Sequence, residues 1–268
     1  MSKVKAGIDA GGSLLKIAYK ENNRIHFKKF PIEKADVAIS WVKAAGVDVQ
    51  AVLTGGKAHI LQKNYFPDAT IVPEFQATCD GARFLLAEQG AKVEDSFLII
   101  NIGTGTSWHL VKGENYERIL GSGLGGGTFV GLGSLLANSQ DYDQLTSLAS
   151  KGSKGNLDLL VKDIYESDES PINGDLTAAN FAKAAKVMHS EADRMAAVTN
   201  MIAETIILLT LQAAALHKVK DIVLIGSTLL NNPFLKTTLE NYLVMLGLTP
   251  VFVANGEFSS SYGALLSV

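Results

Sequence analysis

The hydrophobic positions of residues 1–55 follow, in four segments, the short period of β-strands. The segments 3–9, 14–20, 24–30 and 49–54 are apolar or alternating runs that end in polar or glycine turns. Helical spacing occupies 37–45, 57–64 and 75–90, with a short strand predicted at 69–74. Strands and helices that alternate in this way are typical of the α/β class.

The same order of elements returns in the second part of the chain. Residues 96–121 predict three strands joined by a Gly/Thr turn and a Gly-Glu-Asn turn. Asp9-Ala10-Gly11 then aligns with Asn101-Ile102-Gly103, ninety-two residues later, a period too long for a solenoid. We expect two similar α/β domains, 1–95 and 96–268, with a polar insertion near 150–175 and a terminal helix at 257–268 that returns to the first domain.

The second half also contains a glycine-rich segment, 121–137, that runs into a helix, and a long apolar helix at about 194–218. Strands at 221–227 and 249–255 surround a helix at 233–247. The long helix carries Asn200, Glu204 and Gln212, and these polar residues favour a buried core helix over a membrane span.

Composition narrows the class of protein. The chain has 268 residues, of which 47% are hydrophobic and 19% charged, and its net charge is −3. These values indicate a globular protein and give no basic field for nucleic acid. The single cysteine, Cys79, excludes an intrachain disulfide, and the first residues lack the apolar core of a signal peptide. We expect a cytoplasmic protein without a membrane or nucleic-acid partner.

The turn after the first strand has the composition of a phosphate site. Gly11, Gly12 and Ser13 can direct several backbone N–H groups into one space, and Lys16 could neutralise phosphate charge. Asp9 ends a buried strand, where a carboxylate requires a partner such as Mg²⁺ or its waters. A tight hairpin with an Asx turn at Asp9 fits this motif equally well.

A second small-residue turn favours the phosphate hypothesis. Residues 103–107 read Gly-Thr-Gly-Thr-Ser and occupy the matching place in the repeat. Two such turns that face each other would hold a polyphosphate chain from both sides, whereas a structural turn need not recur with the same chemistry.

The glycines of 121–126 match the pattern G-x-G-x-x-G, but the segment around Asp141 does not have the strand that a dinucleotide fingerprint requires. The P-loop pattern is absent from the sequence. A glycine-rich start of a helix still suits phosphate binding. Close helix packing is the competing explanation, strongest for Gly131 and Gly133.

Phosphoryl transfer to a hydroxyl would require a carboxylate that accepts the proton. Glu74 is favoured because it lies where a strand ends and a helix begins, although first-turn glutamates are common. Asp9 and Asp80 are the other candidates. Arg118 could bind an anionic substrate or be a surface arginine. Ser227, after a buried strand, could admit a nucleoside or cap a helix.

Taken together, these motifs resemble the actin/hexokinase-like ATPase superfamily and, within it, the type II pantothenate kinases of bacteria. The resemblance covers nearly the whole chain through GIDAGGSLLK, PEFQATCDG, INIGTGTSWH, NYERILGSGLGGGTFVGLGSLL, DIYE, GDLTAANF and IGSTLLNN.

The resemblance implies two ribonuclease-H-like domains of actin/hexokinase type, with mixed sheets flanked by helices and a cleft between them. It implies a homodimeric, ATP- and Mg²⁺-dependent kinase of pantothenate with Glu74 as the catalytic base and Asp9 on the metal side. Substrate contacts would be Thr104, Ser107 and Arg118. The nucleotide site would comprise Asp9, Ala10, Gly11, Gly12, Ser13, Leu14, Leu15, Lys16, Thr104, Gly126, Gly127, Thr128, Phe129, Val130, Tyr142 and Ser227.

Two alternatives share the phosphate turns. A sugar or N-acetylhexosamine kinase of the same superfamily would need more side chains for vicinal hydroxyls than 73–81 offers. A non-catalytic ATP-binding switch protein would typically be much longer.

Overall fold

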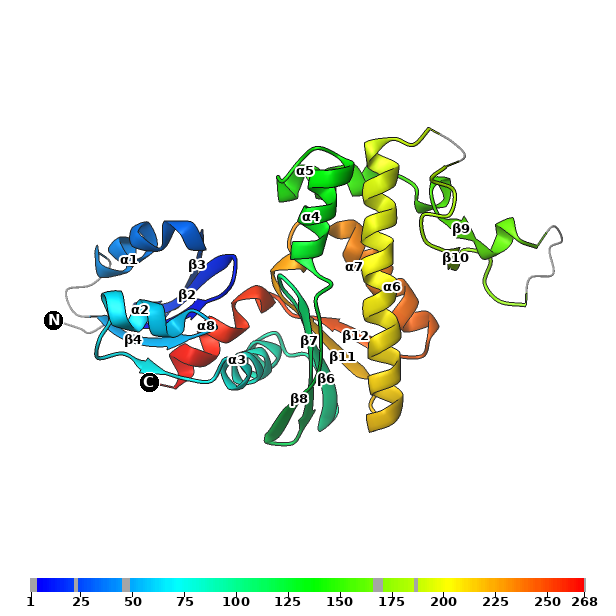
Figure 1. Ribbon diagram of the computed structural model, residues 1–268. Helices are drawn as coiled ribbons and strands as arrows, with labels where there is room; N and C mark the ends of the chain where they lie inside the picture. Colours follow the sequence, from blue (N-terminus) through cyan, green and yellow to red (C-terminus); the bar gives the residue numbers. More distant parts are fainter. Residues whose placement is uncertain (1–3, 22–23, 45–48, 166–170, 186–187, 268) are drawn as a thin grey trace. The chain divides into compact units, whose positions relative to one another are not determined.

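The computed structural model describes residues 4–21, 24–44, 49–165, 171–185 and 188–267 (Figure 1). The chain packs into two compact units, each treated by itself. The first spans Met1–Gly121, Val219–Ser227 and Val251–Val268, and the second spans Ser122–Lys218 and Thr228–Pro250. The boundary expected between residues 95 and 96 rests on the sequence repeat and stays a prediction.

The first sheet of unit 1 contains the strands of the N-terminal repeat in the order β3-β2-β1-β4-β5. Their bounds are β1 (Val4–Ala10), β2 (Leu14–Glu21), β3 (Arg24–Pro31), β4 (Val49–Thr54) and β5 (Thr70–Ile71). β1 pairs antiparallel with β2 and parallel with β4. β5 is shorter than the predicted strand 69–74, because Pro73 has no N–H to donate and α3 begins at Glu74.

The two faces of β1 have different neighbours. Ile8 and its alternate residues join one hydrophobic cluster with α1 (Ala35–Ala44) and α2 (Ala58–Tyr65). Gly7 faces α8 (Ser259–Leu266), and a Cβ at Gly7 would lie 2.0 Å from the carbonyl oxygen of Ser261. Because side chains alternate across a strand, Asp9 shares the face of Gly7.

The second sheet repeats this arrangement, with the order β12-β11-β6-β7-β8. Its strands are β6 (Ser96–Ile102), β7 (Thr106–Lys112), β8 (Asn115–Ser122), β11 (Asp221–Ile225) and β12 (Thr249–Phe252). β6 is antiparallel to β7 and parallel to β11, as β1 is to β2 and β4. Two mixed sheets flanked by helices confirm the expected α/β class and the internal repeat.

The helix that ends each repeat packs against the sheet of the other repeat. α3 (Glu74–Glu88) buries Cys79 and its neighbours against β6, β7 and β11, whereas α8 packs on β1, β2 and β4. The two helices also touch each other. A Cβ at Gly81 would lie 1.9 Å from the Ser259 carbonyl oxygen, and one at Gly263 would lie 1.8 Å from that of Ala77.

Unit 2 is organised around one long helix, α6 (Glu191–His217). It packs with α4 (Gly126–Leu136), α5 (Tyr142–Lys151) and α7 (Pro233–Met245). Among the described residues, α6 is the one helix long and apolar enough to cross a membrane, and 61% of its most apolar window is buried inside the protein. Its burial against three helices agrees with the core helix that the sequence predicts.

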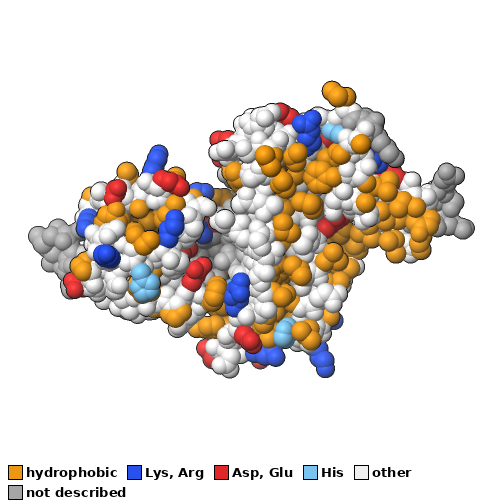
Figure 2. All heavy atoms as spheres, viewed as in Figure 1, with side chains coloured by type: hydrophobic (Ala, Val, Ile, Leu, Met, Phe, Trp, Pro, Cys, Tyr) orange, Lys and Arg blue, Asp and Glu red, His pale blue; other side chains and the backbone are white. Residues whose placement is uncertain are grey.

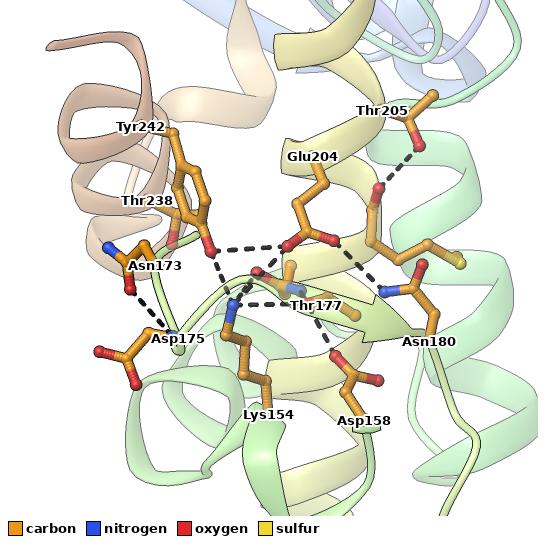
Figure 3. Close-up of polar contacts among 12 residues, drawn as sticks. Lys154, Asp158, Asn173, Asp175, Thr177, Asn180, Glu204, Thr205, Thr238 and Tyr242 are labelled. Carbon is orange, nitrogen blue, oxygen red and sulfur yellow. Dashed lines mark hydrogen bonds and ion pairs between the residues drawn. The ribbon is translucent and has the colours of Figure 1, made fainter. Parts of the chain in front are cut away.

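The polar insertion folds back on α6 through a partly buried polar network in unit 2 (Figure 3). It carries β9 (Leu159–Leu160), which pairs with β10 (Thr177–Ala179). Lys154 Nζ donates to Tyr242 Oη at 2.8 Å and to Asn200 Oδ1 at 3.2 Å, and it lies 3.7 Å from a carboxylate oxygen of Glu204. The network ties the insertion to α6 and α7. Residues 166–170 of the predicted insertion lie outside the described part.

Unit 2 also exposes hydrophobic side chains along α6 and beside it, where Figure 2 shows them gathered. Leu208 and Leu216 of α6 are 61% and 76% exposed. Ile164, Ile172, Val244 and Met245 are also exposed. Exposed hydrophobic residues that gather on one surface are candidates for contact with another molecule.

Candidate active site

The end of β1 places a carboxylate inside unit 1. Asp9 is 5% exposed and lies opposite Lys16 across the β1–β2 ladder, with Asp9 Oδ2 3.8 Å from Lys16 Nζ. Asp9 Oδ1 is buried and has no hydrogen-bond partner among the described residues. Burial chiefly raises the pKa of Asp9 to about 6; Lys16 opposes the rise and the charge of Glu74 adds to it.

Gly55 leaves the space that this carboxylate occupies. It follows β4 with a φ of +92°, and a Cβ there would lie 2.5 Å from Asp9 Oδ1 and 2.6 Å from the Ala10 carbonyl oxygen. Gly226, which follows β11 with a φ of +110°, leaves the corresponding space for Asn101, since a Cβ there would lie 2.7 Å from Asn101 Oδ1. The alignment of Asp9 with Asn101 is therefore also a structural equivalence.

The two small-residue turns meet. Ser13 Oγ lies 3.2 Å from Thr104 Oγ1, so the β1–β2 turn contacts the β6–β7 turn. Lys57 Nζ donates to the Gly12 carbonyl oxygen at 3.1 Å and brings a cation to the first turn. The structure thus brings Gly11, Gly12, Ser13 and Thr104 together, as two turns that hold one phosphate chain would require.

Glu74 is the first residue of α3 and is exposed. Its effect on the pKa of Asp9 indicates that the two carboxylates are within electrostatic range. Asp80 lies further along α3 and interacts with Arg83 and Gln76. Of the three candidate bases, Glu74 is the one that is both exposed and near the end of β1, where the β1–β2 turn begins.

Phe75, in the first turn of α3, links the two predicted substrate contacts Arg118 and Ser107, the second by way of His109. Arg118 of β8 lies with its guanidinium carbon 5.2 Å from the centre of the Phe75 ring, and the same ring is 5.4 Å from the His109 ring. His109 Nε2 lies 2.9 Å from Ser107 Oγ. Gly121 leaves room for Arg118, since a Cβ there would lie 1.9 Å from Arg118 Nη2.

Other predicted site residues are placed differently. Ala10 and Leu15 are fully buried in the core under α1 and α2, so only their backbone could contact a ligand. Leu14 begins β2 beside the turn, and Ser227 follows Gly226 at the end of β11.

Gly126–Val130 and Tyr142 belong to unit 2. Gly126, Gly127 and Thr128 form the first turn of α4, and no side chain of the described residues caps it. Phe129 is buried against Tyr142, with ring centres 5.5 Å apart. Tyr142 donates to the Thr228 carbonyl oxygen, and burial chiefly raises its pKa to about 12. This end of α4 therefore offers free backbone N–H groups, while the Phe129 ring serves packing.

A divalent cation would find few ligands here. No group of three or more histidine, cysteine or acidic side chains suited to a metal ion occurs among the residues described. Mg²⁺ uses one or two carboxylates and keeps its waters, and the unpartnered Asp9 Oδ1 fits that requirement.

Lys57, Phe75 and His109 were not singled out from the sequence. Lys57 follows the glycine pair that ends β4, which is a detectable signal. His109 is two residues after Ser107 on a strand and so shares its face. Phe75 gave no signal, since its role depends on how α3 docks on the second sheet.

The buried charge of Asp9 should be visible in stability. Because the folded-state pKa is above the unfolded value, the folded protein binds more protons than the unfolded chain between about pH 4 and pH 6. The free energy of unfolding therefore falls as pH rises through that window. In EDTA, the free energy of unfolding of Asp9→Asn minus that of the unmodified protein should rise by about 2.5 kcal/mol from pH 4 to pH 7. Denaturant titrations measure it. Exposed Asp68→Asn is the control, and a difference independent of pH would contradict the assignment.

Comparison with known proteins extends over nearly the whole chain. The family described as Fumble matches residues 5–267. The type II pantothenate kinase of Staphylococcus haemolyticus is 40% identical over 269 residues, which cover 98% of this chain and 99% of the relative. That of Staphylococcus aureus is 39% identical over 267 residues, with 98% of each chain covered.

Solved structures share the fold at low sequence identity. Component A of the (R)-2-hydroxyglutaryl-CoA dehydratase of Acidaminococcus fermentans has a TM-score of 0.68 at 18% identity and covers 100% of this chain and 98% of its own. A ROK family glucokinase of Streptomyces griseus, in complex with glucose and AMPPNP, has a TM-score of 0.61 at 12% identity, with 99% of each chain covered. The fold is thus the actin/hexokinase type expected from the motifs, and the chain belongs to the Fumble family of type II pantothenate kinases.

Proposed function

We propose that this protein transfers the γ-phosphoryl group of ATP to the primary hydroxyl of pantothenate, giving 4′-phosphopantothenate in the first step of coenzyme A biosynthesis. One observation carries the chemistry: the turns of the two repeats touch at Ser13 and Thr104, next to the buried carboxylate of Asp9. Membership of the family carries the choice of pantothenate.

The nucleotide would be bound mainly by backbone. The turn from Asp9 to Lys16, together with Thr104, supplies amides and hydroxyls to the phosphates. The uncapped first turn of α4, Gly126–Val130, offers N–H groups and the positive end of a helix dipole. Tyr142 and Ser227 are assigned to the nucleotide by family resemblance.

Asp9 is the residue that would hold Mg²⁺, directly or through water, on its unpartnered Oδ1. The ion would neutralise phosphate charge as it builds up during transfer. Lys16 contributes a fixed positive charge beside Asp9, and Lys57 adds another through the Gly12 carbonyl oxygen.

Glu74 would orient the attacking hydroxyl and accept its proton. Its exposure leaves the carboxylate free to meet a substrate, and it stands at the N-terminal end of α3. Phosphoryl transfer gains most from positioning and charge neutralisation, so a base in reach of the hydroxyl completes the machinery.

Arg118 would bind the pantothenate carboxylate, with Ser107 and Thr104 as further substrate contacts. A guanidinium fits a carboxylate with two parallel hydrogen bonds. Phe75 supports the Arg118 guanidinium from one side and limits its rotation.

The apolar surface of unit 2 supports a homodimer. Leu208 and Leu216 are exposed on α6, the helix that family resemblance assigns to the interface. A second copy of this chain is the proposed occupant. The single cysteine, which excludes an intrachain disulfide, supports a protein of the reducing cytoplasm.

The substrate assignment is tested by ATP-coupled turnover on pantothenate, N-acetylglucosamine and glucose. We expect turnover with pantothenate at kcat/KM at least about a hundredfold above either sugar, since a site built for a carboxylate leaves Arg118 unpaired with a sugar. Turnover on a sugar alone would establish the sugar kinase instead, and ATP binding without turnover on any of the three would indicate a switch protein.

Glu74→Gln should keep ATP binding but lower kcat with pantothenate by about a hundredfold or more, the scale of general-base catalysis. Steady-state kinetics measure it, with exposed Glu117→Gln as the control. A near-normal kcat in Glu74→Gln contradicts the base assignment.

Arg118→Ala should instead raise KM for pantothenate by about tenfold or more and leave KM for ATP nearly unchanged.

Light scattering of the purified protein should give the mass of a dimer. Leu208→Lys should shift that mass toward a monomer, because a lysine ammonium is costly to bury in an apolar interface. Ile60→Lys, at an exposed residue of α2, is the control and should keep the dimer. A monomer in the unmodified protein would refute the proposal.

A further inference from the structure

His109 is a buried titratable residue that the proposed mechanism does not use. It lies on β7 with 1% of its surface exposed, and the Phe75 ring covers it. Its Nε2 is 2.9 Å from Ser107 Oγ, and its Nδ1 is buried without a hydrogen-bond partner among the described residues. A core histidine of purely structural use would normally have both nitrogens satisfied.

The ring is neutral at physiological pH. Burial chiefly, and then the positive charge of Arg118, lower the pKa of His109 to about 4. A neutral imidazole carries one N–H and one bare nitrogen, so the position of a single proton decides what the ring can offer.

The surroundings select one tautomer. With the proton on Nδ1, a buried N–H would have no acceptor, and orphaned buried donors are rarer than under-satisfied acceptors. With the proton on Nε2, that N–H is donated to Ser107 Oγ and only a bare nitrogen is left unpaired. The second arrangement costs less.

The tautomer sets the role of Ser107. A serine hydroxyl donates once and accepts twice. If His109 donates to Ser107 Oγ, the hydroxyl proton is directed away from the imidazole. Ser107 is partly exposed, so that proton can reach a ligand.

We propose that His109 is a positioning residue, which holds the Ser107 hydroxyl as a donor toward an acceptor oxygen of pantothenate. This inference rests on the proposed function. Ser107 and Arg118 then act together as one neutral and one charged donor. Phe75 couples them, because its ring contacts both His109 and Arg118.

The kinetic test compares replacements of His109 that keep or remove its donor. His109→Leu should raise KM for pantothenate about fivefold, the scale of one lost hydrogen bond, with KM for ATP within about twofold. His109→Gln retains an N–H donor at similar reach and should restore most of the affinity. If His109→Leu does not fold, His109→Asn, whose amide is too short to reach Ser107, replaces it.

A double-mutant cycle separates positioning from folding. In a Ser107→Ala background, His109→Leu should raise KM for pantothenate no further. Val111→Ala, two residues along the same face and 1% exposed, is the control and should lower the melting temperature without changing KM. The inference is overturned if His109→Leu leaves KM unchanged, or raises it equally with and without Ser107.

The tautomer has a readout that does not require turnover. ¹⁵N NMR of histidine-labelled protein should show a protonated Nε2 and a bare Nδ1 for His109. A bare Nε2 would overturn the inference even in an active kinase. Failure of the proposed function looks different: the unmodified protein would then not turn over pantothenate at all.

Discussion

The buried carboxylate of Asp9 is the constraint on which the candidate site depends. β1 ends with this side chain on the face that α8 covers, where ionisation is opposed by burial. Lys16 compensates one oxygen from the neighbouring strand, and the other oxygen has no hydrogen-bond partner in the part of the chain that the structure describes. Gly55 has no side chain because one would collide with that oxygen. A buried carboxylate with one unpartnered oxygen has the chemistry that the proposed magnesium nucleotide requires.

The internal repeat explains why the site is asymmetric. Both sheets have the same strand order, and both place a glycine with positive φ beside the residue that ends the first strand. In the first repeat that residue is Asp9, and in the second it is Asn101. The fold thus offers two equivalent positions and charges only one of them. The β1–β2 turn and the β6–β7 turn, which follow these two residues, contact each other through Ser13 and Thr104.

Much of this arrangement is written locally in the sequence. Strand alternation and glycine turns gave the elements of both repeats, and the shift of Asp9 to Asn101 gave their equivalence. Local signals failed where packing decides. β5 is short because Pro73 and the start of α3 leave no room for it. Each of the helices α3 and α8 packs on the sheet of the other repeat, and no periodic pattern in the sequence predicts this packing. The packing of α3 brings the Phe75 ring into contact with His109 and Arg118. Lys57 was missed because it acts on Gly12, which is far away in the sequence. His109 was missed because its one hydrogen bond, to Ser107, depends on side-chain positions that the sequence does not show.

The most direct measurement is the pKa of Asp9 itself, followed by ¹³C NMR of labelled carboxyl groups. Without ligand, the account predicts a value of about 6. Addition of Mg²⁺ and a non-hydrolysable ATP analogue should lower it, since a cation beside the carboxylate favours the charged form. An ordinary aspartate pKa without ligand, or a raised pKa that the magnesium nucleotide leaves unchanged, would contradict the account.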